Sequence, residues 1–203
     1  MDAGKKPRIV VGMSGATGQI YGIRLVETLK AMGAEVHLVM SDWARRTTSL
    51  ETQYTPEEVE SLADYVYDNR DVGAAIASGS FHHDGMVIVP CSVKTLSGVA
   101  NSWNENLLIR AADVTLKERK RLVLVVRETP LHRGHLELML RAVDIGATIL
   151  PPMPAFYYRP RAVNDIVIHT VARILDALDV RQELIKEWTG VSEVLHGEDL
   201  QVI

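Results

Sequence analysis

The residues that decide the fold lie near the start of the chain, at 8–24, and read R-I-V-V-G-M-S-G-A-T-G-Q-I-Y-G-I-R. Ile9, Val10 and Val11 form the short apolar run that a buried parallel strand requires. A turn rich in glycine and small hydroxyl residues follows at 12–18, and apolar residues then recur at helical spacing across 20–32. The stretch therefore predicts a strand, a tight turn and a helix.

The turn at 12–18 suits an anionic ligand. Its three glycines and two hydroxyl residues let backbone N–H groups approach an anion, and the N-terminus of the following helix favours negative charge. The spacing G-x-x-G-x-x-G differs from the dinucleotide-binding fingerprint and from the P-loop. The turn alone is therefore compatible with two interpretations, phosphate binding or close packing of a helix on a strand.

The composition indicates one globular domain. A chain of 203 residues can bury a single good core, and no apolar run approaches the roughly 18 residues of a membrane span. Residues 1–7 lack the apolar segment of a signal peptide, and a single cysteine excludes an internal disulfide. A net charge of −4 without a basic stripe gives no electrostatic footprint for nucleic acid. We therefore predict a cytoplasmic protein with neither a membrane nor a nucleic-acid partner.

Strand and helix patterns alternate along the rest of the chain. Strands are predicted at 9–11, 35–40, 85–90, 121–126 and 147–150. Helices are predicted at 20–32, 42–50, 56–66, 94–101, 105–119, 133–145 and 163–178, with a short helix in the tail. Residues 68–80 read as a loop with one helical turn, and the four prolines of 151–160 exclude regular structure there.

This alternation predicts an α/β fold: a single three-layer, doubly wound Rossmann or flavodoxin-like domain with a mainly parallel sheet. Ligands of such sheets bind beyond the carboxyl ends of the strands. The segments that follow the predicted strands are 12–18, Ser41, 90–95 and 127–131. These four segments are where we expect the functional site.

Charged residues on one later helix and at one strand end are further candidates. Arg110, Asp113 and Lys117 share one helical face, which on charge pattern alone also describes a solvated, salt-bridged surface. Arg127 and Glu128 follow five apolar strand residues and would either serve the site or form an ion pair that closes the sheet. His82 and His83 follow a loop, but no cysteine or carboxylate stands at metal-ligand spacing beside them, so we predict no metal site.

Seven segments together resemble the UbiX-type flavin prenyltransferases, a family that includes the proteins encoded beside hydroxyarylic acid decarboxylases. They are G-M-S-G-A-T-G (12–18), S-L-E-T (49–52), A-S-G-S-F (77–81), P-C-S-V-K-T-L-S-G (90–98), R-A-A-D-V-T-L-K-E-R (110–119), L-V-L-V-V-R-E-T-P-L-H (122–132) and P-P-M-P-A-F-Y-Y-R-P (151–160). On this resemblance the chain divides into a flexible N-terminus at 1–7, an FMN-binding flavoprotein domain at 8–180, and a C-terminal helix and tail at 181–203.

The resemblance implies a role for individual residues. FMN would be held by the four segments that follow the strands, through Gly15, Ala16, Thr17, Ser41, Ser92, Val93, Lys94, Thr95 and Arg127. The phosphate of the prenyl donor would be bound by Arg110, Lys117, Tyr157 and Arg173, with some contributed by a neighbouring copy of the chain. Glu51, Lys117 and Glu128 would be catalytic, and Asp113 would support its neighbours.

The resemblance also implies the reaction. A dimethylallyl group would pass from dimethylallyl phosphate to N5 and C6 of reduced FMN, and the prenylated FMN would serve a partner UbiD-type aromatic acid decarboxylase. The assembly would be a homo-oligomer, a dodecamer in the family. Two alternatives share the fold class: an FMN-dependent decarboxylase, although the chain has no P-x-M-N-x-x-M-W-like segment, and a flavodoxin-like FMN-binding protein.

Overall fold

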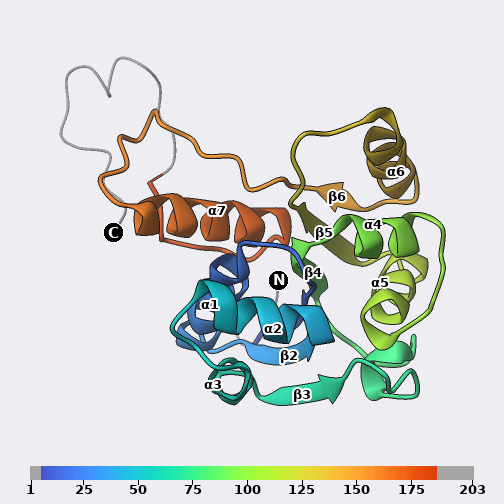
Figure 1. Cartoon of the computed structure of the whole chain (residues 1–203). Coiled ribbons are helices and arrows are strands. Elements are labelled where there is room, and N and C mark those ends of the chain that lie inside the picture. Colours follow the sequence, from blue (N-terminus) through green and yellow to red (C-terminus); the bar gives the residue numbers. More distant parts are fainter. Residues whose placement is uncertain (1–5, 187–203) are drawn as a thin grey trace.

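The computed structural model describes residues 6–186, which form one parallel sheet covered by helices (Figure 1). The six strands are β1 (Arg8–Met13), β2 (Glu35–Met40), β3 (Tyr65–Asp68), β4 (Gly85–Cys91), β5 (Arg121–Val126) and β6 (Thr148–Ile149). Their order is β3-β2-β1-β4-β5-β6, and every neighbouring pair is parallel. The predicted α/β fold is therefore confirmed.

Helices cover both faces of the sheet and make three layers (Figure 1). They are α1 (Gln19–Ala31), α2 (Asp42–Glu51), α3 (Pro56–Ser61), α4 (Val93–Ala100), α5 (Leu107–Lys117), α6 (Arg133–Asp144) and α7 (Val163–Ala177), with a 3₁₀ turn, η1 (Ala75–Ala77). Side chains of α1 and α7 pack on one face, and those of α4, α5 and α6 on the other. No helix within 6–186 has the length and apolar character needed to cross a bilayer.

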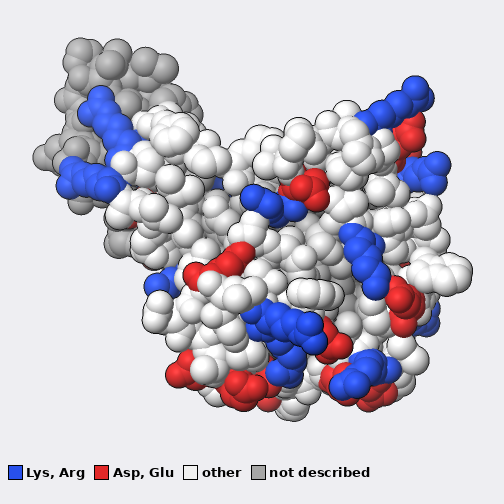
Figure 2. All heavy atoms as spheres, in the orientation of Figure 1, with Lys and Arg blue, Asp and Glu red and all other residues white. Residues whose placement is uncertain are grey.

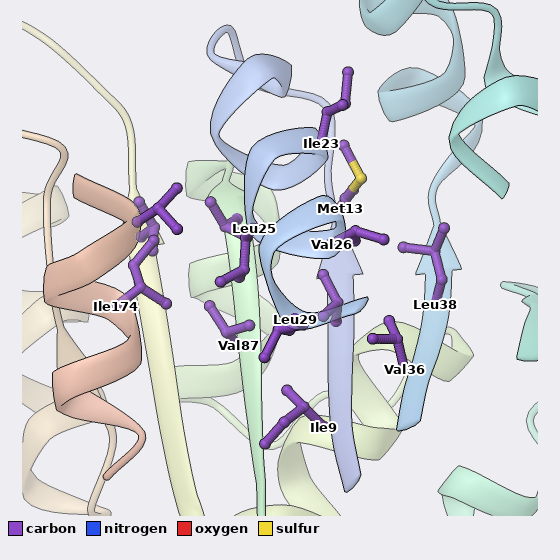
Figure 3. Packing of buried hydrophobic residues seen from close by; sticks show 14 of the residues in the cluster. Ile9, Met13, Ile23, Leu25, Val26, Leu29, Val36, Leu38, Val87 and Ile174 are labelled. Atoms are coloured by element: carbon purple, nitrogen blue, oxygen red, sulfur yellow. The ribbon is translucent and has the colours of Figure 1, made fainter. Parts of the chain in front are cut away.

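The core shows why β1 lies at the centre. Ile9 and Met13 point toward α1, where they meet side chains such as Ile23 and Leu29 (Figure 3). Val10 points to the opposite face and joins the second core cluster. Because both faces of β1 are buried, its apolar run is continuous rather than alternating.

Local sequence signals set several helix ends. The Ser41 hydroxyl accepts a hydrogen bond from the N–H of Ala44, and Thr55 and Glu58 form a reciprocal capping box at the start of α3. Gly33 follows α1 with a φ of +76°, a left-handed conformation that glycine adopts without strain. Residues adjacent to each helix thus fix where α1 ends and where α2 and α3 begin.

Some predicted boundaries were wrong. The helix expected at 56–66 ends at Ser61, and Tyr65–Asp68 forms the edge strand β3 by pairing with β2. The strand expected at 85–90 continues to Cys91, because an irregularity between Ile88 and Cys91 accommodates Pro90, which has no N–H to donate. Residues 181–186 are not helical, and the rest of the predicted tail helix lies outside the described residues, as do 1–5.

The strand order places a topological switch point between β1 and β4. From β1 the chain moves outward to β2 and β3, returns to β4 on the other side of β1, and continues to β5 and β6. In sheets of this kind, the loops that leave the two strands at the switch point diverge, and the crevice between them is where ligands bind. On the face shown in Figure 2, positive and negative side chains are interspersed rather than segregated.

Candidate active site

Two buried side chains brace the turn that follows β1. The Ser14 hydroxyl donates to the carbonyl of Pro90 at 2.9 Å and accepts from the N–H of Ser92 at 2.7 Å. Gln19 is fully buried, and its Nε2 donates to the carbonyls of Ser14 and Ala16 at 2.8 and 2.7 Å. The conformation of the turn and its distance from β4 are therefore fixed by side chains of the turn itself.

Gly15 is required by a close contact. A Cβ atom at this position would lie 2.3 Å from Cβ of Trp43, at the start of α2. Real atoms do not approach so closely, so any larger residue would push the turn away from α2. The contact brings the carboxyl ends of β1 and β2 together at one side of the crevice.

Several backbone N–H groups at the strand ends have no hydrogen-bond acceptor within residues 6–186. They belong to Gly15 and Thr17 in the turn, Asp42 and Trp43 at the start of α2, and Val93 and Lys94 at the start of α4. Ser41 and Ser92 cap these two helices and leave the first N–H groups of each helix open. Unpaired N–H groups at helix starts, together with the helix dipoles, attract anions.

Glu51 occupies the N-terminus of α1. Its Oε2 accepts from the N–H groups of Gly18 at 2.8 Å and Gln19 at 3.1 Å. The N–H of Ala16 is also paired, with the carbonyl of Ser14 at 2.9 Å. An anion bound by this turn would thus meet the N–H groups of Gly15 and Thr17, whereas α1 already carries a carboxylate at its positive end.

Arg127 and Glu128 extend the site at the end of β5. The N–H of Arg127 donates to the carbonyl of Cys91 at 3.0 Å, which aligns this loop with the end of β4. Within the described part of the chain, the Arg127 side chain has no hydrogen bond or ion pair, and the Glu128 carboxylate accepts only from the N–H of Thr129. The alternative of an Arg–Glu ion pair that closes the sheet is therefore wrong.

The charged face of α5 is not brought into this crevice as a whole. Arg110 pairs with Asp113 at 3.3 Å. Lys117 is the last residue of α5, four residues before β5 begins, and it pairs with Glu118 beside Gly79. Lys117 therefore lies near the amino-terminal ends of the strands, whereas the turn follows the carboxyl-terminal end of β1.

The proline-rich loop lies against α1 and α7. Burial raises the pKa of Tyr158, and the Asp165 carboxylate and Tyr21 of α1 act on it in the same direction. The hydroxyl of Tyr157 lies 3.2 Å from Nε2 of His169 on α7. Farther along α7, Arg173 pairs with Asp176 at 2.7 Å. Tyr158 is thus close to Tyr21 in the first turn of α1, whereas Tyr157 contacts α7 through His169, and Arg173 lies farther along that helix.

Cysteine and metal chemistry find no support among the described residues. Cys91 is fully buried, and burial raises the pKa of its thiol, so the reactive thiolate is disfavoured. No group of three or more histidine, cysteine or acidic side chains within 6–186 is arranged to hold a metal ion.

Comparison with known proteins assigns the chain to a family. A family model described as "Flavoprotein" matches residues 2–176. The chain is 59% identical over 186 residues to the flavin prenyltransferase UbiX of Thauera aromatica, covering 92% of this chain and 96% of that relative. It is 55% identical to UbiX of Escherichia coli strain K12, covering 90% and 98%. This chain belongs to the UbiX flavin prenyltransferase family.

Solved structures of family members share the fold closely. AnUbiX, crystallised in complex with FMN and dimethylallyl pyrophosphate, is 46% identical with a TM-score of 0.90, over 92% of this chain and 100% of that one. A dodecameric FMN-dependent UbiX-like decarboxylase from Escherichia coli O157:H7 is 48% identical with a TM-score of 0.88, over 90% and 100%. The resemblance noted in the sequence is thereby confirmed.

In this UbiX-family chain the structure adds residues to the site that the sequence did not reveal. Ser14 and Gln19 shape the turn, and His169 contacts Tyr157. A polar residue with apolar neighbours in a helical pattern carries little signal. Only the fold shows that Gln19 faces the turn and that His169 faces the proline-rich loop.

Proposed function

We propose that this chain is a flavin prenyltransferase that joins a dimethylallyl group to N5 and C6 of reduced FMN and releases phosphate from dimethylallyl phosphate. The observation that carries the proposal is the set of unpaired N–H groups at three strand ends beside the switch point. The names of relatives at 55% and 59% identity, and the ligands of AnUbiX, support the same assignment.

The residues present fit FMN. The unpaired N–H groups suit its phosphate, and the crevice between the ends of β1 and β4 lies where flat cofactors bind in such sheets. We assign FMN binding to Gly15, Ala16, Thr17, Ser41, Ser92, Val93, Lys94, Thr95 and Arg127. In this assignment Ala16 contributes through its position alone, because its N–H is already paired.

We assign the donor phosphate to Tyr157, Arg173, Arg110 and Lys117. Because Lys117 lies at the opposite edge of its own sheet, we infer that a neighbouring copy supplies the α5 residues. The UbiX-like structure from Escherichia coli O157:H7 is dodecameric, which supports a homo-oligomer here. Leu136, Leu140 and Val143 on α6 are 52%, 61% and 50% exposed, and they offer an apolar contact surface for such an assembly.

The assigned side chains explain how the reaction is assisted. Reduced FMN supplies the nucleophilic N5 and C6 when bound. Lys117 and the arginines stabilise the charge that develops on the departing phosphate, a contribution of roughly 3 kcal/mol per donor in comparable sites. Glu128 is placed to accept a proton, because its carboxylate is exposed beside Arg127 and not neutralised by it. Glu51 holds the turn in place beside these groups.

The product, prenylated FMN, would be released in the cytoplasm to a UbiD-type aromatic acid decarboxylase. This part of the proposal follows from the family and the composition of the chain. No decarboxylase chemistry is required of this protein itself.

The deciding experiment incubates the protein anaerobically with reduced FMN and dimethylallyl phosphate and then measures the mass of the recovered flavin. We expect a gain of one five-carbon prenyl unit, with release of inorganic phosphate. Recovery of unaltered FMN from protein shown to bind it, with the diphosphate donor also tried, would overturn the proposal in favour of a decarboxylase or a flavin carrier.

A further inference from the structure

Tyr157 is held in place by a polar contact that the mechanism above does not use. It lies in a segment without regular structure and is 54% exposed. Its hydroxyl lies 3.2 Å from Nε2 of His169, and its ring meets the His169 ring edge-on, at 5.9 Å and 81°. A half-exposed loop tyrosine has many rotamers open to it, so this contact selects one of them.

His169 is itself rigidly placed. It is 7% exposed on α7, and its ring stacks on that of Tyr158 at 4.4 Å with an interplanar angle of 1°. Tyr158 is buried, and its hydroxyl reaches the carbonyl of Asp165 at 3.4 Å. The imidazole is therefore clamped between a helix and a buried ring, and its Nε2 has a fixed direction.

The surroundings of His169 favour a neutral ring. Burial lowers its pKa, and the charge of Arg173 one turn away lowers it further, against an opposing contribution from Asp176. A neutral imidazole has one N–H donor and one bare nitrogen, so its tautomer decides what Tyr157 can do. If Nε2 carried no proton, the Tyr157 O–H would donate to it and could not donate to another acceptor.

We propose that His169 is a positioning residue whose Nε2–H donates to the hydroxyl oxygen of Tyr157 and so directs the tyrosine O–H toward the phosphate of the prenyl donor. This inference rests on the proposed function, because it takes Tyr157 as a phosphate ligand. Donation into the hydroxyl oxygen also polarises the O–H and makes it a stronger donor to an anion. A ring that only packed against Tyr158 would need no nitrogen at this position.

The test is a double-mutant cycle with His169→Phe and Tyr157→Phe. Phenylalanine keeps a ring to stack on Tyr158 but removes the Nε2–H. We expect His169→Phe to raise the dissociation constant and the KM of dimethylallyl phosphate about tenfold. The reason is that the Tyr157 O–H would no longer be directed at the phosphate, and a hydrogen bond to a charged group would be lost. The dissociation constant of FMN should stay unchanged. In the Tyr157→Phe background, His169→Phe should have no further effect, because its route to the phosphate is gone.

His169→Gln separates the donor from the packing. The glutamine amide can offer an N–H near the position of Nε2 without an aromatic ring. The His169→Gln variant should therefore keep most of the affinity for dimethylallyl phosphate, even if its melting temperature falls. Equal losses in the glutamine and phenylalanine variants, wild-type affinity in His169→Phe, or additive losses in the double variant would each overturn the inference.

Calorimetric titration of FMN-loaded protein with dimethylallyl phosphate keeps this test separate from the proposed function. If the wild type binds the donor but does not alkylate FMN, the proposed function fails while the dissociation constants still decide the role of His169. If the wild type alkylates FMN and the three variants do not follow the cycle, only the inference about His169 fails.

Discussion

At the scale of single residues, Glu128 is the side chain whose chemistry is easiest to isolate. Its carboxylate accepts one hydrogen bond from the adjacent N–H of Thr129 and makes no ion pair with Arg127 within 6–186. We expect Glu128→Gln to bind FMN normally and to lose about a hundredfold in the rate of prenylation, because an amide cannot accept the proton. Single-turnover assays with reduced FMN measure that rate.

Glu183→Gln is the matched control for Glu128→Gln. The Glu183 side chain is 85% exposed, pairs only loosely with Arg181 at 3.7 Å, and lies outside the site. Its rate should equal that of the wild type. Prenylation by Glu128→Gln at the control rate would remove Glu128 from the mechanism and leave the departing phosphate as the base.

His83 makes stability depend on pH. The ring is buried, and its Nδ1 lies 3.1 Å from the carbonyl oxygen of Gly85. Burial, and to a lesser extent the charge of Lys120, lowers the pKa of His83 from 6.5 to about 4. The unfolded chain therefore binds a proton that the folded chain does not between these two values. Stability is complete above pH 6.5 and falls as the pH drops toward 4, by up to about 3 kcal/mol.

Urea unfolding between about pH 4 and pH 7 measures this dependence. His83→Gln removes the titrating group but keeps an amide that can donate to the Gly85 carbonyl, so its free energy of unfolding should change less across the range. An identical slope in the two proteins would show that other groups, such as the carboxylates, account for the acid sensitivity.

At the scale of elements, α1 packs tightly against the sheet at Gly22. A Cβ atom there would lie 2.6 Å from the carbonyl oxygen of Val89 and 2.8 Å from Cε of Met13. Alanine normally favours a helix, but here it would push α1 away from β4. We expect Gly22→Ala to destabilise the protein by about 1–3 kcal/mol in chemical unfolding.

Gly73 provides the comparison for Gly22. It is exposed, and a Cβ there would meet only Oδ1 of Asp71, at an ordinary 3.4 Å. Gly73→Ala should change stability by no more than about 0.5 kcal/mol. If Gly22→Ala changed the free energy of unfolding as little as Gly73→Ala does, α1 would have to be free to shift on the sheet.

The elements also show which parts of the fold a sequence can and cannot reveal. The buried strands β1, β4 and β5 and the starts of the capped helices α2 and α3 are marked by local signals, and they were predicted in place. The edge strand β3 was missed because Tyr65–Asp68 is short, mostly exposed and lacks the aliphatic run that marks the buried strands. Only its pairing with β2, far away in sequence, makes it a strand.

The candidate site, like the fold, could be predicted from the sequence only in part. The rule that ligands bind at the carboxyl ends of parallel strands located its four segments without coordinates. The hydrogen bonds of Glu51 to Gly18 and Gln19 could not be foreseen, because they join residues more than 30 positions apart. Nor could a charge pattern show that Lys117 lies at the other edge of the sheet.

At the scale of the whole molecule, the proposed sharing of sites between copies predicts complementation. We expect Lys117→Ala and Arg127→Met to be inactive alone but partly active when coexpressed. In a random mixture, about one quarter of the sites would combine an intact Arg127 from one copy with an intact Lys117 from its neighbour. The yield of prenylated flavin per protomer measures the recovery.

Lys117→Ala coexpressed with Arg110→Ala is the control for this complementation. Both residues lie on α5, so one neighbouring copy would supply both to a site, and every mixed site would lack one of them. That pair should stay inactive. Full inactivity of the first pair in oligomers shown to be mixed would instead place Lys117 in the site of its own chain.

The position of β1 between β2 and β4 has a consequence for biosynthesis. A chain emerging from the ribosome completes β1, β2 and β3 first, and one edge of the buried strand β1 then has no partner until residues 85–91 appear. An unpaired buried-type strand is prone to associate with other nascent chains. The segments to which we assign FMN binding are completed later still, with Arg127, so on this assignment the cofactor cannot protect the early intermediate. Until β4 is made, only the helices already complete, α1, α2 and α3, can cover the partial sheet.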